Sequence, residues 1–575
     1  MTSARSVYAE FGLRALPRLL TLADRNPLSP TYGCFHRDYW LYKTSDFPDA
    51  VRQFSVHALA LAYAHPLTDP STGVSNPYYR NLQIRDWAIA SLKFWASIQH
   101  ADGSFDEFYP FERGWVGPTA FTTYAAAEAF RLLRGEVPPE VAQRVTHALR
   151  RASRCISEGE REEDRLANHH AMAVLAVATA ADVLQDCRLE ALVPKLWTGF
   201  LRTHHQAEGW SREYDGPDPG YLSATVSFLA KVYKLYREKP PADCPLPLAD
   251  LRSVLRTSVD FCSYFVFPDG STAGILGSRN TVHFYPHGFE FLSSEFPLAA
   301  SIAERMMRSL AEGNLVPPDI MSDRYVHYRV PEFLLAAIDT GKRPPLLPQL
   351  PYERPPFSTF FPAAGVAVSA QGPSYTVANL AKGGAVKSYR RDTERLCLND
   401  SGWVGELVDG RVVTSQWMDP AHEISAGERT WRVGGQLHLV PSAKLFRITT
   451  HLIFRLALLL LGWHPRAAHW LKGRIRKSLI LGRRPVPCRF ERTIEFREDH
   501  LTITDRLANP SRLQFRRLLL GGEVPVRYVP QSRFFQPSEL QSRSEQTSPE
   551  DLKRLNAGET LQVTRTVAFS LAPEE

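Results

Sequence analysis

Asn168-His169-His170 opens the run Ala171-Met172-Ala173-Val174-Leu175-Ala176-Val177-Ala178, and this stretch decides the fold class. An uninterrupted apolar run of this kind predicts a buried helix. Tyr221 follows Asn168 by 53 residues, directly after the turn signal Pro217-Asp218-Pro219-Gly220, and opens a second apolar-periodic run that ends at Tyr236. An amide, a pair of imidazoles and a phenol are therefore each expected at the start of a helix. Because helix N-termini favour anions, a pocket that gathers these groups could bind a carboxylate and move a proton beside it.

The same helical theme extends on both sides of this stretch. Apolar-periodic runs lie at 50–64, 84–98, 119–134, 139–157, 169–186, 190–204, 221–237, 250–265, 296–311 and 331–340. Short turns rich in Gly, Pro and Asp separate them, which predicts helical hairpins arranged as a solenoid or a closed toroid. Residues 31–40 are polar and aromatic; we expect an N-terminal arm packed across the domain, with the wall of a cleft as the alternative.

The pattern changes after a proline-rich linker at 343–356. Residues then alternate with period two at 375–380, 493–496, 501–504 and 561–564, which predicts an antiparallel sheet, interpreted as a sandwich. The expected fold class is therefore α+β with two domains: a helical toroid over 1–345 and an antiparallel β-sandwich over 357–575.

Composition excludes several classes of protein. The chain has 575 residues, 44% of them hydrophobic and 22% charged, as in soluble globular proteins. Seven scattered cysteines without a CxxC pair favour neither disulfides nor a cysteine zinc site. There is no run of eighteen uncharged apolar residues and no signal-peptide core, so we expect a cytoplasmic location. Walker, Rossmann and GxSxG motifs are absent, and no cofactor is expected.

A basic insertion at about 445–484 interrupts the strand pattern. From Trp431 to Phe490 there are twelve Lys or Arg and no Asp or Glu, so the net charge of +7 belongs to this segment. Long aliphatic residues alternate with the basic ones, which favours a helical pair at an anionic membrane surface. The alternative is a packed insertion with a solvated basic face, and nucleic acid is not expected because stacking aromatics are few. The candidate membrane-binding residues are Arg455, Trp463, Trp470, Lys472, Arg474, Arg476 and Lys477.

Two loops have the composition of sugar-binding segments, in which aromatic faces lie beside hydrogen-bonding groups. Residues 102–113 offer Glu107 and Tyr109, and residues 277–287 offer Arg279, Asn280 and His283. Packed turns can have the same composition. The spacing of His283 and His287 would suit two zinc ligands on one helix face, but Pro286 interrupts any helix there, and we expect no metal.

In its order of elements the chain resembles the heparinase II/III-like polysaccharide lyases and their alginate lyase and uronyl C5-epimerase relatives. The resemblance rests on Asn168-His169, on Tyr221 and, more loosely, on the loop 102–109. It implies a helical toroid followed by a sandwich, an Asn or His that neutralises the substrate carboxylate, and a Tyr that acts as catalytic acid and often as base. The family usually has a further His early in the sandwich. The comparable stretch 379–387 has none, so the electrostatic part of that role falls to Lys382 or Lys387, or to no residue at all.

The predicted chemistry is the elimination of a uronic acid. Asn168 would neutralise the carboxylate, His169 or its neighbour His170 would take the C5 proton, and Tyr221 would donate to the leaving oxygen. Tyr221 could also act as the base if Arg212 or Arg279 lowered its pKa. The structural alternatives are a helix-capping Asn168 and a half-buried Tyr221. Residues 212–215 would contact sugar or cap the turn.

The expected function is β-elimination of a uronate-containing polysaccharide, free or lipid-linked, in bacterial exopolysaccharide metabolism. The expected place is the cytoplasmic face of the inner membrane. A C5-epimerase shares the first step and remains an alternative. A non-catalytic glycan-binding scaffold of a polysaccharide synthesis machine is a second alternative.

Overall fold

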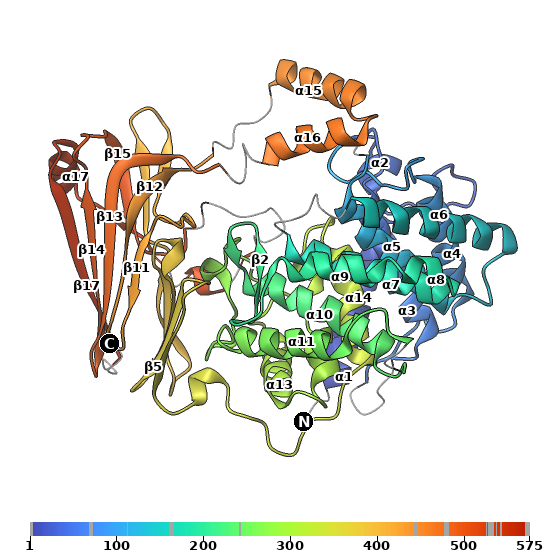
Figure 1. The fold of residues 1–575 in the computed structure, drawn as a ribbon, viewed down its shortest axis with the longest axis horizontal. Helices are drawn as coiled ribbons and strands as arrows, with labels where there is room; N and C mark the ends of the chain where they lie inside the picture. The colour runs from blue at the N-terminus through green and yellow to red at the C-terminus, as the bar shows by residue number, and fades with distance from the viewer. Residues whose placement is uncertain are drawn as a thin grey trace.

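The computed structural model describes residues 4–67, 73–111, 113–159, 166–240, 243–441, 447–476, 482–524, 526, 534–535, 537–540 and 543–569, without the side chains of 465, 469, 472, 475, 476, 537 and 538. Helices fill the N-terminal part and antiparallel strands the C-terminal part (Figure 1). The predicted change from helical to strand periodicity is thereby confirmed.

The helical part contains a helix at each of the predicted apolar runs. The main helices are α1 (Ala4–Leu22), α3 (Ser55–Ala64), α4 (Leu82–Ser97), α5 (Val116–Leu132), α6 (Pro139–Glu158), α7 (Ala167–Leu184), α9 (Val193–Leu201), α10 (Pro219–Tyr236), α11 (Leu248–Ser263), α12 (His287–Leu292), α13 (Pro297–Ala311) and α14 (Val326–Ile338). Two single-turn helices, α2 (Arg37–Trp40) and α8 (Cys187–Glu190), lie between them. The helix α1, which was not predicted, packs on α14, and the expected arm at 31–40 contains only the single turn α2.

Burial separates two kinds of helix. Nearly every residue of α7 is buried, which fits a helix that is apolar all round and therefore covered on all sides. In α6 the buried residues Val141, Val145, Leu149 and Ile156 recur at spacings of four and seven, so only one stripe faces the core. In the series α3, α5, α7, α10, α12 and α14, each helix packs on the next one. The last helix, α14, packs on α3.

A five-stranded antiparallel meander follows the helices. It runs β4 (Phe357–Phe361), β5 (Val366–Gln371), β6 (Ser374–Asn379), β7 (Ala385–Arg390) and β8 (Arg395–Asp400). Successive residues of a strand point to opposite faces. Accordingly Val366 and Val368 of β5 join the core of the helical part, whereas Ala367 joins the core of the second sheet. The meander is thus buried on both faces and forms the layer between the helices and the second sheet.

The second sheet is also antiparallel. Its strands are β9 (Trp403–Leu407), β10 (Val412–Thr414), β11 (Glu423–Ala426), β12 (Thr430–Leu439), β13 (Pro485–Phe496), β14 (His500–Ala508), β15 (Phe515–Leu520), β16 (Glu545–Gln546) and β17 (Thr560–Ala568). The short helix α17 (Pro549–Asn556) connects the last two. The register of β13 and β14 places Arg492 opposite Asp505, and their side chains form a buried ion pair of 2.7 Å.

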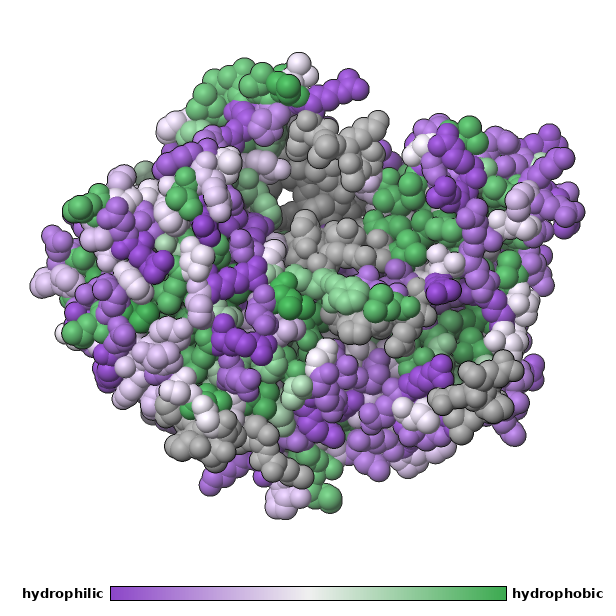
Figure 2. All heavy atoms as spheres, turned by 180° about the vertical axis from the view of Figure 1, so that it is seen from behind, coloured by the Kyte–Doolittle hydropathy of each residue, from purple (hydrophilic) through white to green (hydrophobic). Residues whose placement is uncertain are grey.

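The basic insertion leaves this sheet between β12 and β13 as two helices, α15 (Ile448–Leu461) and α16 (Pro465–Arg476). They lie above the helical part in Figure 1, and Figure 2 shows hydrophobic residues gathered over α15 at the top of the view. Among the residues that the structure describes, no helix combines the length and the apolar character that crossing a membrane requires.

Candidate functional site

The N-terminal parts of α5, α7 and α14 meet around Phe121 of α5, which also contacts the middle of α10. Its ring contacts His169 of α7 at 5.6 Å, Phe228 of α10 at 5.7 Å and Tyr328 of α14 at 5.2 Å between centroids. The predicted catalytic residues lie at these same ends, since Asn168 and His169 are in the first turn of α7 and Tyr221 is in the first turn of α10. The partial positive charges of helix N-termini therefore accumulate where an anion is expected.

Asn168 is buried and bound to a second buried residue, Glu213 of the short strand β2 (Trp210–Glu213). Its Nδ2 donates to Oε1 at 2.9 Å and to Oε2 at 2.8 Å, and its backbone N–H donates to Oε1 at 2.8 Å. Burial raises the pKa of Glu213 to about 8, although the hydrogen bonds from Asn168 act in the opposite direction. At neutral pH Glu213 is therefore largely uncharged and does not repel an anionic substrate.

His169 and His170 differ in their surroundings. His170 is buried, whereas His169 is only partly covered and packs on Phe121. Gly117 of α5 makes room for the imidazole of His169, since a Cβ at position 117 would lie 2.8 Å from its Cε1. Of the two predicted candidates for the base, His169 is the one whose imidazole lies against the N-terminal part of α5.

Tyr221 is held at the start of α10 by Asp218, the N-cap residue, whose Oδ1 accepts the backbone N–H of Tyr221 at 3.1 Å. The ring of Tyr221 packs edge-on against His283 at 5.7 Å. Burial raises the pKa of Tyr221 well above its ordinary value. The suggestion that an arginine lowers this pKa is wrong in the unliganded protein, so Tyr221 is a proton donor there.

Arg279 is 1% exposed, and its guanidinium lies 3.9 Å from the ring centroid of Tyr214. Its backbone N–H donates to Oδ2 of Asp218 at 2.9 Å, so one carboxylate holds both Arg279 and Tyr221. The Nε and Nη1 atoms of Arg279 have no hydrogen-bond partner among the described residues. A buried guanidinium with unpaired donors is suited to bind a carboxylate or sulfate.

Other predicted substrate-binding residues have partners inside the protein. The Nζ of Lys382 donates to the carbonyls of Ile275 and Gly277 at 2.7 Å and to Oδ1 of Asn280 at 2.6 Å. An ammonium has three donors, so Lys382 retains none for a substrate. It ties the turn after β6 to the loop that contains Arg279. A direct hydrogen bond from Lys382 to a substrate is therefore not available in this arrangement.

Arg212 and Tyr109 lie differently from the expectation. Arg212 is exposed on β2 while its neighbour Glu213 is buried, so its side chain points to the opposite face of the strand. Tyr109 packs edge-on against Phe454 of α15, with ring centroids 4.7 Å apart. His283, in contrast, lies beside Tyr221, and its buried Nε2 has no partner in the described part of the chain.

Glu107 belongs to a network that the sequence did not reveal. Arg324 donates from Nη2 to Glu107 at 2.7 Å, from Nε to Asp49 at 2.9 Å and from Nη1 to the hydroxyl of Tyr325 at 3.0 Å. Tyr325 in turn contributes to the raised pKa of Tyr221. No local motif marks Arg324, because its two carboxylate partners are separated from it by more than two hundred residues.

The predicted membrane residues fall into three groups. Arg455 pairs with Asp46 of the helical part, and Trp463 stacks on Phe111. Trp470 and Arg474 are exposed on α16. The side chains of Lys472 and Arg476, and the whole of Lys477, lie outside the described residues.

A candidate metal site lies among the strands of the C-terminal part, away from His283 and His287. His283 faces Tyr221, while His287 bonds Asp339 at 2.8 Å, so these two do not act together. Asp419, His422 and His438 place one ligand atom each within 4.8 Å of one another. The buried Nε2 of His422 and Nδ1 of His438 lack partners among the described residues. Two imidazoles and a carboxylate form a donor set that suits zinc. This set of residues was not predicted from the sequence.

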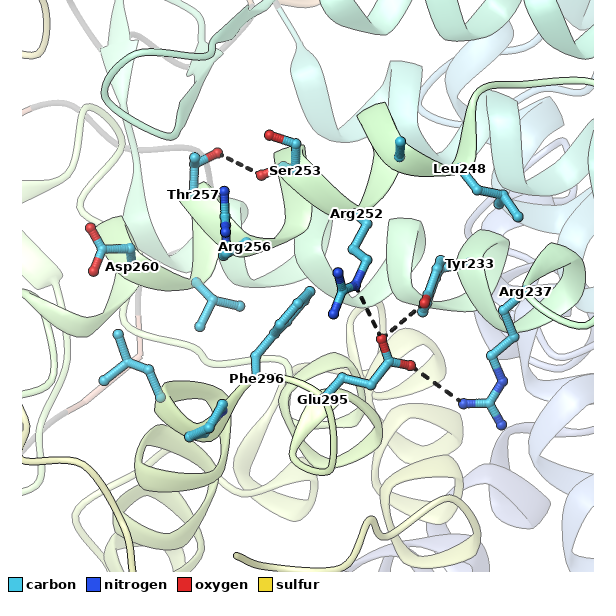
Figure 3. Close-up of a pocket in the computed structure, with 14 residues that line it drawn as sticks. Tyr233, Arg237, Leu248, Arg252, Ser253, Arg256, Thr257, Asp260, Glu295 and Phe296 are labelled. Atoms are coloured by element: carbon cyan, nitrogen blue, oxygen red, sulfur yellow. Dashed lines mark hydrogen bonds and ion pairs between the residues drawn. The ribbon is translucent and has the colours of Figure 1, made fainter. Parts of the chain in front are cut away.

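Two cavities lie away from the predicted catalytic residues. One of about 490 Å³ is lined near the C-terminal ends of α5, α7, α10 and α14, including Lys231, Lys234 and Asp339. The other, of about 790 Å³, is a groove between α10, α11 and α13. Figure 3 shows Glu295 in this groove pairing with Arg237 and Arg252 and accepting from Tyr233. Glu295 is thus shared by two arginines and a tyrosine of the groove.

Comparison with known proteins gives no match to a family model and no match among curated proteins. Solved structures that resemble the chain are polysaccharide lyases. The Streptomyces coelicolor A3 chondroitin AC lyase in complex with chondroitin sulphate has 13% identity and a TM-score of 0.48, covering 90% of this chain and 68% of that one. A Paenibacillus xanthan lyase has 11% identity and a TM-score of 0.47, covering 90% and 46%. The heparan sulfate lyase HepC from Pedobacter heparinus has 10% identity and a TM-score of 0.37, covering 88% of this chain and 70% of that one.

Proposed function

We propose that this chain cleaves a uronic-acid-containing polysaccharide by β-elimination. The observation that carries the proposal is that the carboxylate of Asp218 accepts hydrogen bonds from two residues, Tyr221 and Arg279. Its two oxygens accept from the backbone of Tyr221 and the backbone of Arg279, so one carboxylate anchors the residue with a protonated phenol and the residue with a buried guanidinium whose donors are unpaired among the described residues. Elimination next to a carboxylate requires an anion-binding group and a proton donor, and Asp218 anchors one candidate for each.

The proposal includes the architecture that the resemblance implied. The contacts that lead from α3 through α5, α7, α10, α12 and α14 back to α3 support a toroid. The hydrophobic core shared by Ala378 of the meander and Ile494 of the second sheet supports a sandwich. The N-termini of the helices around Phe121 would then open at one end of the toroid, where a polymer can enter.

Neutralising the substrate carboxylate falls to Arg279. The Nδ2 of Asn168 already donates to both oxygens of Glu213, so Asn168 and Glu213 together position the first turn of α7. Pairing with a guanidinium stabilises the negative charge that spreads from C5 into the carboxylate in the transition state. Asn280 and Lys382 support the loop of Arg279 from behind.

The two proton transfers are assigned to His169 and Tyr221. His169 takes the C5 proton, the electron pair of that bond forms the C4–C5 double bond, and the C4–O bond breaks. The leaving oxygen receives the phenolic proton of Tyr221, whose raised pKa keeps that proton on the enzyme until it is needed. The products are a new hydroxyl end and an unsaturated uronate.

The proposed setting is bacterial exopolysaccharide metabolism at the cytoplasmic face of the inner membrane. The substrate there is an acidic polysaccharide or a lipid-linked oligosaccharide. The support is the run of basic residues without acids from Trp431 to Phe490.

The test is the ultraviolet absorbance of the unsaturated uronate formed from a panel of uronate polysaccharides. The same polymers after reduction of their carboxyl groups to alcohols serve as controls. We expect absorbance to rise with the native polymers alone, because only they carry the carboxylate that acidifies C5 and conjugates with the new double bond. No rise with any native polymer would contradict the elimination.

Two alternatives make different predictions in the same samples. A C5-epimerase would exchange the C5 hydrogen for deuterium in heavy water without forming an unsaturated product. A non-catalytic glycan-binding scaffold would do neither. The observation that favours the scaffold is the complete use of the Lys382 donors inside the protein, since this removes one of the two lysines that could replace the family's sandwich histidine.

A further inference from the structure

The insertion helix α15 and Trp463, which follows it, are fixed on one side by aromatic contacts with a single loop of the helical part. Trp463 stacks on Phe111 with ring centroids 5.5 Å apart, and the guanidinium of Arg113 lies 4.7 Å from the centroid of Trp463. Phe454 meets Tyr109 edge-on at 4.7 Å. These contacts determine which side of α15 faces the protein.

The opposite side of α15 is apolar and exposed. Its large aliphatic side chains, each at least 44% exposed, are Ile448, Leu452, Ile453, Leu456, Leu459 and Leu460. Residues 448, 452, 456 and 460 are four apart and form one stripe along the helix. Single exposed leucines are normal on protein surfaces, but six exposed aliphatic side chains on one side of a helix, four of them in a continuous stripe, indicate an interaction site.

Charge identifies the partner. Arg466 and Arg474 are exposed on α16, Arg474 lies 5.9 Å from the ring of the exposed Trp470, and the surrounding sequence has no acidic residue. Aliphatic side chains beside tryptophan and arginine are the composition of helices that lie in an anionic lipid interface. A second copy of this chain would oppose one cationic surface with another, which disfavours a dimer through this face.

We propose that the exposed stripe of α15, with Arg466, Trp470 and Arg474 of α16, docks into the surface of an anionic lipid bilayer. With 14 residues, α15 is about 21 Å long and would lie in the plane of the interface. Its apolar stripe enters the boundary of the acyl chains, and the arginines remain at the phosphates.

Docking also concerns the candidate site, because α15 and the site share a loop. The loop that holds Trp463 and Phe454 also supplies Glu107 and Phe108 to Arg324, at 2.7 Å and 3.8 Å. A bilayer bound to α15 therefore positions a wall of the site and brings it close to the membrane. This consequence rests on the proposed function, whereas the docking itself does not.

The experiment is sedimentation of the full-length protein with vesicles of phosphatidylcholine mixed with phosphatidylglycerol, and with vesicles of phosphatidylcholine alone. The test variant carries Leu452→Ser, Leu456→Ser and Leu460→Ser. The matched control carries Leu28→Ser and Leu346→Ser, which are 92% and 85% exposed outside the insertion. Circular dichroism and thermal melting verify that both variants fold, and light scattering gives the oligomeric state.

We expect the unmodified protein and the control to bind the anionic vesicles, less tightly as salt rises. We expect the triple variant to bind at least about tenfold more weakly, since three inserted side chains are lost. Equal binding of the triple variant and the control would overturn the proposal. A dimer that the unmodified protein and the control form, but the triple variant does not, would also overturn the proposal. No uronate substrate is used, so failure here is distinguishable from failure of the proposed elimination.

Discussion

Glu213 caps the helix α7 from a distant strand, because its carboxyl accepts both the backbone and the side-chain nitrogen of Asn168 at 2.8–2.9 Å. The first N–H groups of a helix have no partner within the helix, and capping residues normally lie next to them in sequence. Here the cap is 45 residues away. Because Glu213 is buried, the cap is an ionisable group whose proton is coupled to folding.

The first prediction concerns the pH dependence of stability. Glu213 has a folded-state pKa of about 8, above its unfolded value of roughly 4.3. Between these values the folded protein retains a proton that the unfolded chain releases, so the contribution of Glu213 to stability falls as pH rises through this window. Glu213→Gln removes the titration. We expect urea denaturation to show a smaller loss of stability from pH 5 to 8 in the variant, and equal losses would contradict the raised pKa.

The second prediction compares two lysines of α10 that each pair with a carboxylate at 2.6 Å. Lys231 and its partner Glu332 are buried, whereas the side chain of Lys234, paired with Asp339, is 45% exposed. We expect Lys231→Met to lower the free energy of unfolding by about 3–5 kcal/mol, because it leaves a buried charge unpaired. Lys234→Met should cost at most about 1 kcal/mol. Denaturant titration measures both free energies of unfolding. Similar losses in the two variants would show that burial does not determine how much each ion pair contributes to stability.

The third prediction concerns Asp419, His422 and His438. We expect added zinc to raise the melting temperature, by an amount equivalent to about 2.7 kcal/mol at a hundred times the dissociation constant. His438→Ala should abolish this shift. His500→Ala is the matched control, because His500 also pairs with an aspartate, Asp499, at 2.7 Å. A shift that persists in His438→Ala would place zinc elsewhere.

Local patterns in the sequence predicted much of the fold. Helical periodicity located α7 and α10, and the turn before Tyr221 placed that residue in the first turn of its helix. Alternation located strands such as β14. These features depend on neighbours within a few residues, which is why they can be read without the structure. The helix α1 was missed because the aromatic, polar segment after it dominated the interpretation of residues 1–50.

The composition of the site was less predictable, because it depends on contacts between distant segments. Lys382 was a plausible substrate ligand until three acceptors around residue 277 were found to use its donors. Arg212 and Glu213 are adjacent, yet only the strand β2 shows that they face opposite ways. Asp419 and His438 belong to different segments of the second sheet domain, so their spacing does not form a recognisable metal motif.

The measurement that tests the central claim most directly is the rate of unsaturated uronate formation by Tyr221→Phe, beside Tyr233→Phe as the control. Both tyrosines lie on α10, but Tyr233 donates to Glu295 in the groove of Figure 3, away from the predicted catalytic residues. We predict that Tyr221→Phe slows the reaction by about 10²–10⁴-fold, the usual contribution of a positioned acid, and that Tyr233→Phe leaves it unchanged. Equal rates for Tyr221→Phe and the unmodified protein would contradict the assignment of Tyr221 as the acid and the site built around it.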